Sequence, residues 1–102
     1  MLDAFEVLNR NVVIPAGALA QVWRGSRRQH RLVQLLDADN VEISALDLSQ
    51  SLAAGALLAA RGASDVIDAS VVITARERQH WVVTSDAKDL RRLDPDLPII
   101  EV

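Results

Sequence analysis

Three aspartates border the most hydrophobic stretch of the chain, residues 64–86, and their positions suit a shared metal site. Asp65 and Asp68 lie three apart at the start of an expected helix, so they share one face of it. Asp86 follows the apolar run HWVVTS, and in open α/β sheets ligands bind beyond the carboxyl ends of the strands. Converging carboxylates repel one another unless a cation lies between them, and hard oxygen ligands favour Mg²⁺ or Mn²⁺. We therefore expect these three aspartates to hold one of these ions.

Most of these carboxylates also have an ordinary structural explanation. Asp65 in a first helical turn is stabilised by the positive end of the helix dipole, and Asp86 suits a plain N-cap of the next helix. Asp89 is either a surface carboxylate, which we favour, or a helper that supports the metal ligands. Asp68 lies one turn into its helix in an apolar stretch, where such explanations are weakest. Only the combination of these aspartates favours a metal site over the structural explanations of each one.

Amphipathic and short apolar runs alternate along the chain and predict the elements that position these side chains. We expect helices over residues 1–9, 16–25, 26–38, 46–62, 65–78 and 87–93, and strands over residues 12–14, 41–44, 80–85 and 99–102. Gly62 is expected as a left-handed helix cap and Ser64 as the next N-cap. The strand runs are apolar on both faces, which is typical of a parallel sheet covered by helices. The sequence therefore predicts an α/β fold.

The composition of the chain excludes several kinds of protein and of functional site. The 102 residues suffice for one domain. The net charge is −3, so nucleic acid would have to bind a local basic patch. The absence of cysteine excludes disulfides, thiolate metal sites and cysteine catalysis, and it permits a reducing cytoplasm, where we expect the protein to act. No signal peptide is recognised, and the longest apolar run, residues 52–60, is far shorter than the roughly 20 residues of a membrane helix.

The segment DASVVITARERQHWVVTSDAKDL resembles the C-terminal half of PIN-domain nucleases, in particular the VapC-like toxins of bacterial toxin–antitoxin pairs. The residues that match the motif of that family are Asp68, Ala69 and Ala75 in the helix and Thr84, Asp86, Asp89 and Leu90 at the strand end. Upstream, VVIPAGALAQVWRGSRR resembles the second strand, the proline and the following helix of that family. The resemblance extends over almost the whole chain.

The resemblance implies a single PIN-like domain over residues 1–102, with a Rossmann-like three-layer α/β/α arrangement around a parallel sheet. It also implies an acidic pocket that holds one or two Mg²⁺ or Mn²⁺ ions and hydrolyses RNA phosphodiesters. In that pattern Asp68 takes the third acidic position and Asp86 the fourth. Thr84 would orient the Asp86 loop through a hydrogen bond of its hydroxyl.

Two departures from the family pattern bear on activity. The first acidic residue of the family ends a first strand that this chain does not show, so we expect an N-terminally truncated domain; Asp3 lies in the expected first helix and does not replace it. Gln21 holds the position of the usual glutamate and brings no negative charge. With Asp68, Asp86 and Gln21 as the catalytic set, we expect a weakened ribonuclease. The alternative is a degenerate PIN-like module that binds an antitoxin-like partner or RNA without cleaving it.

A basic segment suggests how RNA would bind. Residues 8–36 contain no acidic residue and include Arg24, Arg27, Arg28 and Arg31, which form either an RNA-backbone track or a solvated helix face. Arginine pairs bidentately with phosphate, and binding gains from counterion release. With the RNA, the resemblance implies a cognate antitoxin and a homodimer as partners. We expect the dimer interface to include Leu19, Val22, Trp23 and the helix over residues 52–58.

Overall fold

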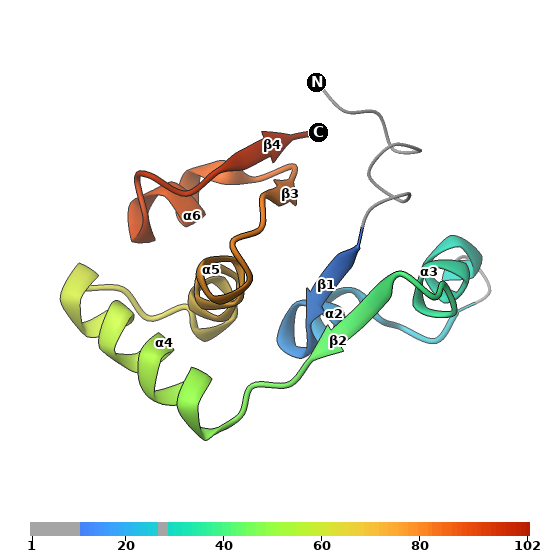
Figure 1. Cartoon of the computed structure of the whole chain (residues 1–102), viewed down its shortest axis with the longest axis horizontal. Helices are drawn as coiled ribbons and strands as arrows, with labels where there is room; N and C mark the ends of the chain where they lie inside the picture. Colours follow the sequence, from blue (N-terminus) through green and yellow to red (C-terminus); the bar gives the residue numbers. More distant parts are fainter. Residues whose placement is uncertain (1–10, 27–28) are drawn as a thin grey trace. The chain divides into compact units, whose positions relative to one another are not determined.

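The computed structural model describes residues 11–26 and 29–102 (Figure 1). These residues form five α-helices and four short β-strands, so the predicted α/β composition is confirmed for the described part of the chain. The helix expected over residues 1–9 lies outside it, as do Arg27 and Arg28. The chain divides into two compact units, residues 1–45 and 46–102. The expectation of a single domain stays a prediction.

The first unit pairs two strands in parallel. Strand β1 (Val12–Pro15) and strand β2 (Val41–Ser44) align over their whole length. Helices α2 (Ala16–Val22) and α3 (His30–Leu36) lie between them in the sequence, which supplies the crossover that parallel strands require. Pro15 ends β1 and is also the N-cap of α2, a position where its fixed φ and missing N–H are tolerated. Both strands lie where the sequence predicts them.

The second unit begins with the longest described helix, α4 (Leu48–Arg61). Its N-cap is Asp47, whose carboxylate accepts a hydrogen bond from the Gln50 N–H at 2.9 Å. It ends at Gly62, which has a φ of 61°. The left-handed glycine cap predicted from the sequence is therefore confirmed. None of the described helices is both long enough and apolar enough to cross a membrane.

Helix α5 (Val66–Arg78) follows after a short loop, and its N-cap is Asp65. The prediction of Ser64 as the N-cap was wrong by one residue. The Asp65 carboxylate accepts the hydrogen bond of the Asp68 N–H, and an aspartate satisfies this otherwise unpaired donor as well as serine does. The helix ends at Gln79, the only described non-glycine residue with a positive φ, of 55°.

Two short strands complete the second unit. Strand β3 (Val82–Thr84) pairs in parallel with strand β4 (Ile99–Glu101), and helix α6 (Ala87–Leu93) connects them. The strand predicted over residues 80–85 is therefore shorter than expected, since His80 and Trp81 precede it. Asp86 directly follows the end of β3 and starts α6, as the sequence predicts.

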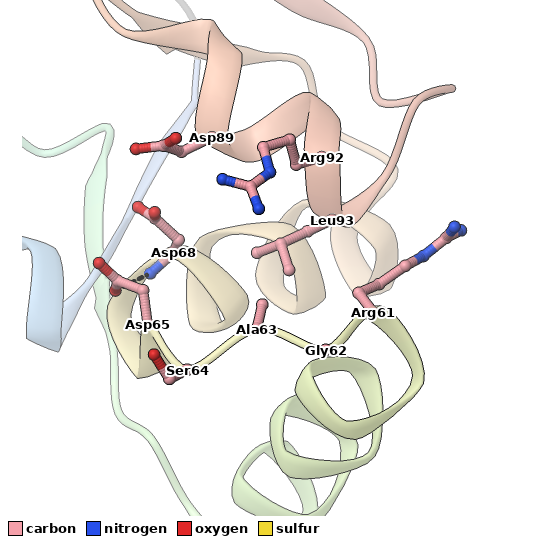
Figure 2. A pocket seen from close by; sticks show the side chains of 9 residues that line it. All are labelled: Arg61, Gly62, Ala63, Ser64, Asp65, Asp68, Asp89, Arg92 and Leu93. Atoms are coloured by element: carbon pink, nitrogen blue, oxygen red, sulfur yellow. Dashed lines mark hydrogen bonds between the residues drawn. The ribbon is translucent and has the colours of Figure 1, made fainter.

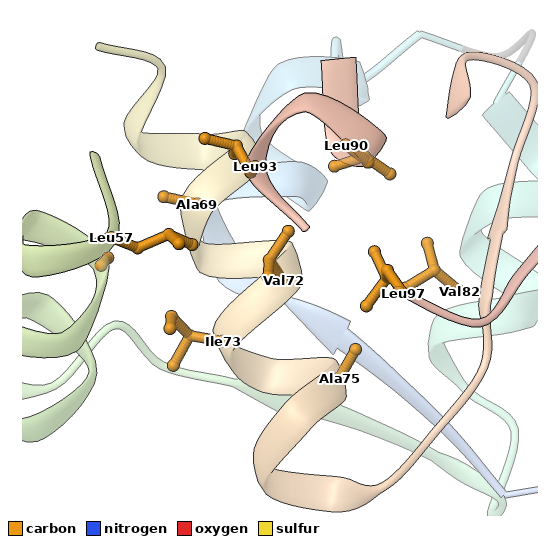
Figure 3. Close-up of a cluster of buried hydrophobic side chains, with 10 residues drawn as sticks. Leu57, Ala69, Val72, Ile73, Ala75, Val82, Leu90, Leu93 and Leu97 are labelled. Carbon is orange, nitrogen blue, oxygen red and sulfur yellow. The ribbon is translucent and has the colours of Figure 1, made fainter. Parts of the chain in front are cut away.

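The hydrophobic core of the second unit is centred on α5 (Figure 3). Val72, on this helix, is the largest fully buried side chain. The other core residues come from α5 itself, from α4, β3 and α6, and from the loop before β4: Ala54, Leu57, Ala69, Ile73, Ala75, Val82, Leu90, Leu93 and Leu97. This packing fixes the start of α5 next to α6, and both helices carry aspartates considered above.

One side of α4 is packed and the opposite side is open. Ala54 and Leu57 are 2% and 8% exposed and belong to the core. Leu48 and Leu52 are 75% and 66% exposed, and they continue at helical spacing into a row of small exposed residues, Gly55, Ala56 and Ala59. We call these five residues the α4 stripe. The dimer interface expected to include residues 52–58 stays a prediction, and because Leu57 faces the core only part of that segment is accessible to a partner.

The strands form two separate sheets, where the sequence predicts one. Strand β1 pairs with β2 and strand β3 with β4, and each sheet has two strands. The parallel pairing within each sheet agrees with the prediction, and the three-layer PIN-like arrangement stays a prediction.

Candidate functional site

An open, polar pocket lies in the second unit where the loop between α4 and α5 faces α6 (Figure 2). Its volume is ≈ 280 Å³. The lining residues are Arg61, Gly62, Ala63, Ser64, Asp65, Asp68, Asp89, Arg92 and Leu93. The pocket thus brings together three of the carboxylates considered from the sequence and two arginines.

Asp65 and Asp68 are held by the start of α5. One carboxylate oxygen of Asp65 accepts the hydrogen bond of the Asp68 N–H at 2.9 Å, so Asp65 has a structural role as the N-cap of α5, in place of the first-turn position expected from the sequence. Its second oxygen is not used by this bond, and Asp65 lines the pocket (Figure 2). Asp68 stands one turn further along and is half-buried.

Asp86 and Thr84 form a small turn at the end of β3. The Asp86 N–H donates a hydrogen bond to the Thr84 hydroxyl oxygen at 3.0 Å, which is the contact expected of Thr84. Asp86 occupies the N-cap position of α6, but its side chain makes no capping hydrogen bond. A plain N-cap role therefore does not explain its carboxylate. Asp86 does not line the pocket, although its charge acts on Asp68.

Asp68 is the electrostatic centre of the site. Its partial burial raises the pKa of its carboxyl above the ordinary 3.8, and the negative charges of Asp65, Asp89 and Asp86 raise it further, in that order. Three carboxylates thus act on Asp68 at the junction of α5, β3 and α6. Asp89, for which the sequence favoured a surface role, affects Asp68 more than Asp86 does.

The carboxylates border the pocket without meeting at one point. Within the described residues no three histidine, cysteine, aspartate or glutamate side chains are close enough to hold a metal ion as they stand. Like charges with no cation between them repel one another. Their chemistry fits Mg²⁺ or Mn²⁺, which bind carboxylates and water through oxygen. A metal ion would require these side chains to rotate toward one another.

The first unit holds the remaining predicted site residues. Gln21 is exposed on α2, and a contribution of its amide to the acidic site stays a prediction. The Arg24 guanidinium donates hydrogen bonds to the backbone carbonyls of Trp23 and Ala20, at 2.7 and 3.5 Å. Arg24 therefore caps the end of α2, which limits its use for RNA. Arg31 is exposed on α3, and the RNA-binding role of the arginines stays a prediction.

Sequence reasoning did not single out Arg92 or Arg61, which both line the pocket. Arg92 lies three residues after Asp89 on α6, and residues three apart on a helix share a face. That spacing was the signal that would have placed Arg92 beside the acidic residues. Arg61 is the last residue of α4 and borders the pocket, although its side chain points away from it (Figure 2).

No protein-family model, curated protein or solved structure matches this chain. The relation to PIN-domain nucleases therefore rests on the motif in residues 68–90 and remains a proposal.

Proposed function

We propose that this protein is a metal-dependent endoribonuclease of the VapC-like toxin type, with weakened activity, and that its metal site lies between Asp68, which lines the pocket of the second unit, and Asp86, which lies beside it. The observation that carries the proposal is the arrangement around Asp68, whose pKa is raised by its burial and by three neighbouring carboxylates. An open pocket lined with acidic residues and arginine gives a phosphate group access to this centre.

Asp68 and Asp86 are the proposed principal ligands of Mg²⁺ or Mn²⁺. Asp65 offers one oxygen, because the other caps α5, and Asp89 lines the same pocket. When bound, the ion would activate a water molecule and neutralise the charge that develops on the phosphate. Clustered carboxylates cost electrostatic energy in the apo protein, which is a reason for a cation to be the ligand.

The roles of the individual residues follow from their positions. Asp68 is the proposed ligand on the pocket side, because it lines the pocket and lies among the other carboxylates. Thr84 holds the backbone of Asp86 through the hydroxyl hydrogen bond, so the carboxylate of Asp86 is directed from a fixed turn. Gln21, in place of a glutamate, is the proposed reason for weakened activity.

The second candidate function is a PIN-like module that binds RNA or an antitoxin-like protein without cleaving it. The observation in its favour is that no three acidic side chains of the described residues already form a metal-binding group. The two candidates differ in their expected affinity for a divalent ion. For both candidate functions, the proposed partners are RNA, a cognate antitoxin and a second copy of the chain.

A titration with Mn²⁺, followed by calorimetry, separates the two functions. The enzyme requires saturable binding that Asp68→Asn reduces by about tenfold or more, since each close carboxylate contributes to holding a hard cation. Asp96→Asn is the matched control, because it removes the same charge from an exposed loop that is outside the pocket. Cleavage of a labelled RNA should require Mn²⁺ and be lost in Asp68→Asn. Absence of Mn²⁺ binding in the unmodified chain would support the binding module instead.

A further inference from the structure

The arginines around the acidic pocket fall into two kinds. Arg76 forms an ion pair with Asp94, and Arg91 forms one with Glu101, both at 3.0 Å. Arg92 has no hydrogen bond or ion pair with any described residue, although it lines the pocket with three carboxylates. Within the described part of the chain, its guanidinium is therefore not engaged by another side chain or a backbone carbonyl.

The direction of the side chains distinguishes Arg92 from Arg61. Figure 2 shows the Arg92 guanidinium extending from α6 into the pocket on the side of Asp68, whereas Arg61 points away from it. An arginine that served only as a counter-ion would contact a carboxylate, as Arg91 does in the same helix. Arg92 instead lies near the acidic residues with its donor groups available to a ligand.

A phosphate group is the ligand that this arrangement suits. The guanidinium presents several N–H donors in a planar fork that matches two oxygens of a phosphate. In an acidic pocket, an anionic substrate needs a positive group to approach the carboxylates at all. The pocket is open to solvent and wide enough, at ≈ 280 Å³, for one phosphodiester group.

We propose that Arg92 binds the phosphodiester group of the RNA substrate in this pocket and positions it against Asp68. The identity of the ligand as RNA rests on the proposed function, whereas the phosphate-binding role rests on Arg92 and the pocket. The arginines of residues 24–31 would then contact RNA elsewhere along its backbone, and Arg92 would determine where the reacting phosphate lies.

The test measures binding of a fluorescently labelled single-stranded RNA by anisotropy. All variants of the full chain carry Asp68→Asn, which keeps the RNA intact and removes one carboxylate that faces Arg92. Arg92→Gln should weaken binding by about tenfold or more, as expected for the loss of a charge-assisted hydrogen bond. It should also lower the slope of log Kd against log salt by about 0.7, the value for one phosphate of a single strand.

Arg91→Gln is the matched control, because it removes the same charge from the adjacent position of α6, where the arginine is paired with Glu101. It should leave both the affinity and the salt slope nearly unchanged. Equal losses in Arg91→Gln and Arg92→Gln would overturn the proposal, because the effect would then be one of net charge. Unchanged binding in a folded Arg92→Gln variant would overturn it too. Thermal unfolding followed by circular dichroism shows that each variant is folded.

Cleavage separates this proposal from the proposed function. If Arg92→Gln weakens RNA binding but the unmodified chain never cleaves RNA with Mn²⁺, the phosphate site stands and the nuclease assignment fails. If Mn²⁺-dependent cleavage requires Asp68 but is unaffected by Arg92→Gln, the nuclease stands and the role of Arg92 is refuted.

Discussion

The carboxylate of Asp65 accepts a hydrogen bond from the backbone N–H of Asp68 at 2.9 Å, so one acidic residue of the pocket caps the helix that carries the other. The bond fixes the position of Asp68 relative to the loop. It also leaves Asp65 with two separable functions, because one oxygen can cap the helix while the other faces a ligand.

We predict that Asp65→Ala lowers the free energy of unfolding by about 0.5–2 kcal/mol, the usual loss for an N-cap. Asp65→Asn keeps the capping oxygen and should be close to the wild type in stability. If Asp65 also binds the metal, Asp65→Asn should weaken Mn²⁺ binding without this loss. Urea unfolding and calorimetry measure the two effects. An Asp65→Ala variant as stable as the wild type would show that the cap contributes nothing.

We predict that the Asp68 carboxyl makes the fold less stable as the pH rises. Burial, followed by the charges of Asp65, Asp89 and Asp86, raises its folded-state pKa above 3.8. The folded chain then binds this proton more tightly than the unfolded chain does. By linkage, the free energy of unfolding falls as the pH rises from 3.8 through the raised pKa.

Asp68→Asn removes this titration and tests the prediction by urea unfolding over a series of pH values. The stability of the variant relative to the wild type should increase with pH across this window and stay constant below it. Asp68→Asn also removes a negative charge from the first turn of α5, which lowers the free energy of unfolding by about 0.3–1 kcal/mol. The test is therefore how the difference in stability between variant and wild type changes with pH, and not its size at one pH. Asp96→Asn is the control and should not show the same dependence. A difference between Asp68→Asn and the wild type that does not change with pH would refute the explanation.

The buried hydroxyl of Thr74 is expected to destabilise the fold. Thr74 is 4% exposed, and its hydroxyl has no hydrogen-bond partner in the described part of the chain. Thr74→Val replaces it with an apolar group of similar shape and should raise the free energy of unfolding by about 1 kcal/mol. Ser70→Ala is the matched control on α5, because the Ser70 hydroxyl donates to the Ile67 carbonyl at 2.7 Å. A loss of stability in Thr74→Val would indicate that the hydroxyl is satisfied by an internal water molecule.

The α4 stripe is the surface we expect a second copy of the chain to cover. It contains no charged residue, and large exposed apolar patches are typical of interaction sites. Leu52→Glu should shift the protein from dimer to monomer, as measured by sedimentation at micromolar concentration. Ser51→Glu introduces the same charge at a neighbouring exposed position outside the stripe and should have little effect. If the unmodified chain sediments as a monomer, the stripe is not a dimer interface.

Local signals in the sequence were enough to predict the helices and strands of the described chain. Alternating apolar runs predicted all four strands, and Gly62 marked the end of α4 because a left-handed cap requires a residue without a side-chain clash. The same local reasoning placed Asp86 directly after β3. Most boundary errors were small, as for Ser64, because neighbouring polar residues compete for the same N–H groups. The helices predicted over residues 16–25 and 26–38 are shorter in the structure, where they extend over Ala16–Val22 and His30–Leu36.

Only the tertiary structure decided which of these residues meet. Asp89 and Arg92 face Asp65 and Asp68 because the core around Val72 packs α6 against α5, and no sequence period records the distance between two helices. The sequence also did not predict which strands pair with each other, since hydrogen bonds between strands join residues far apart in the chain. The sequence determined the types of chemistry available, namely carboxylates and arginines without cysteine. Packing determined that Arg92 reaches the pocket while Arg91, its neighbour, is used by an ion pair with Glu101.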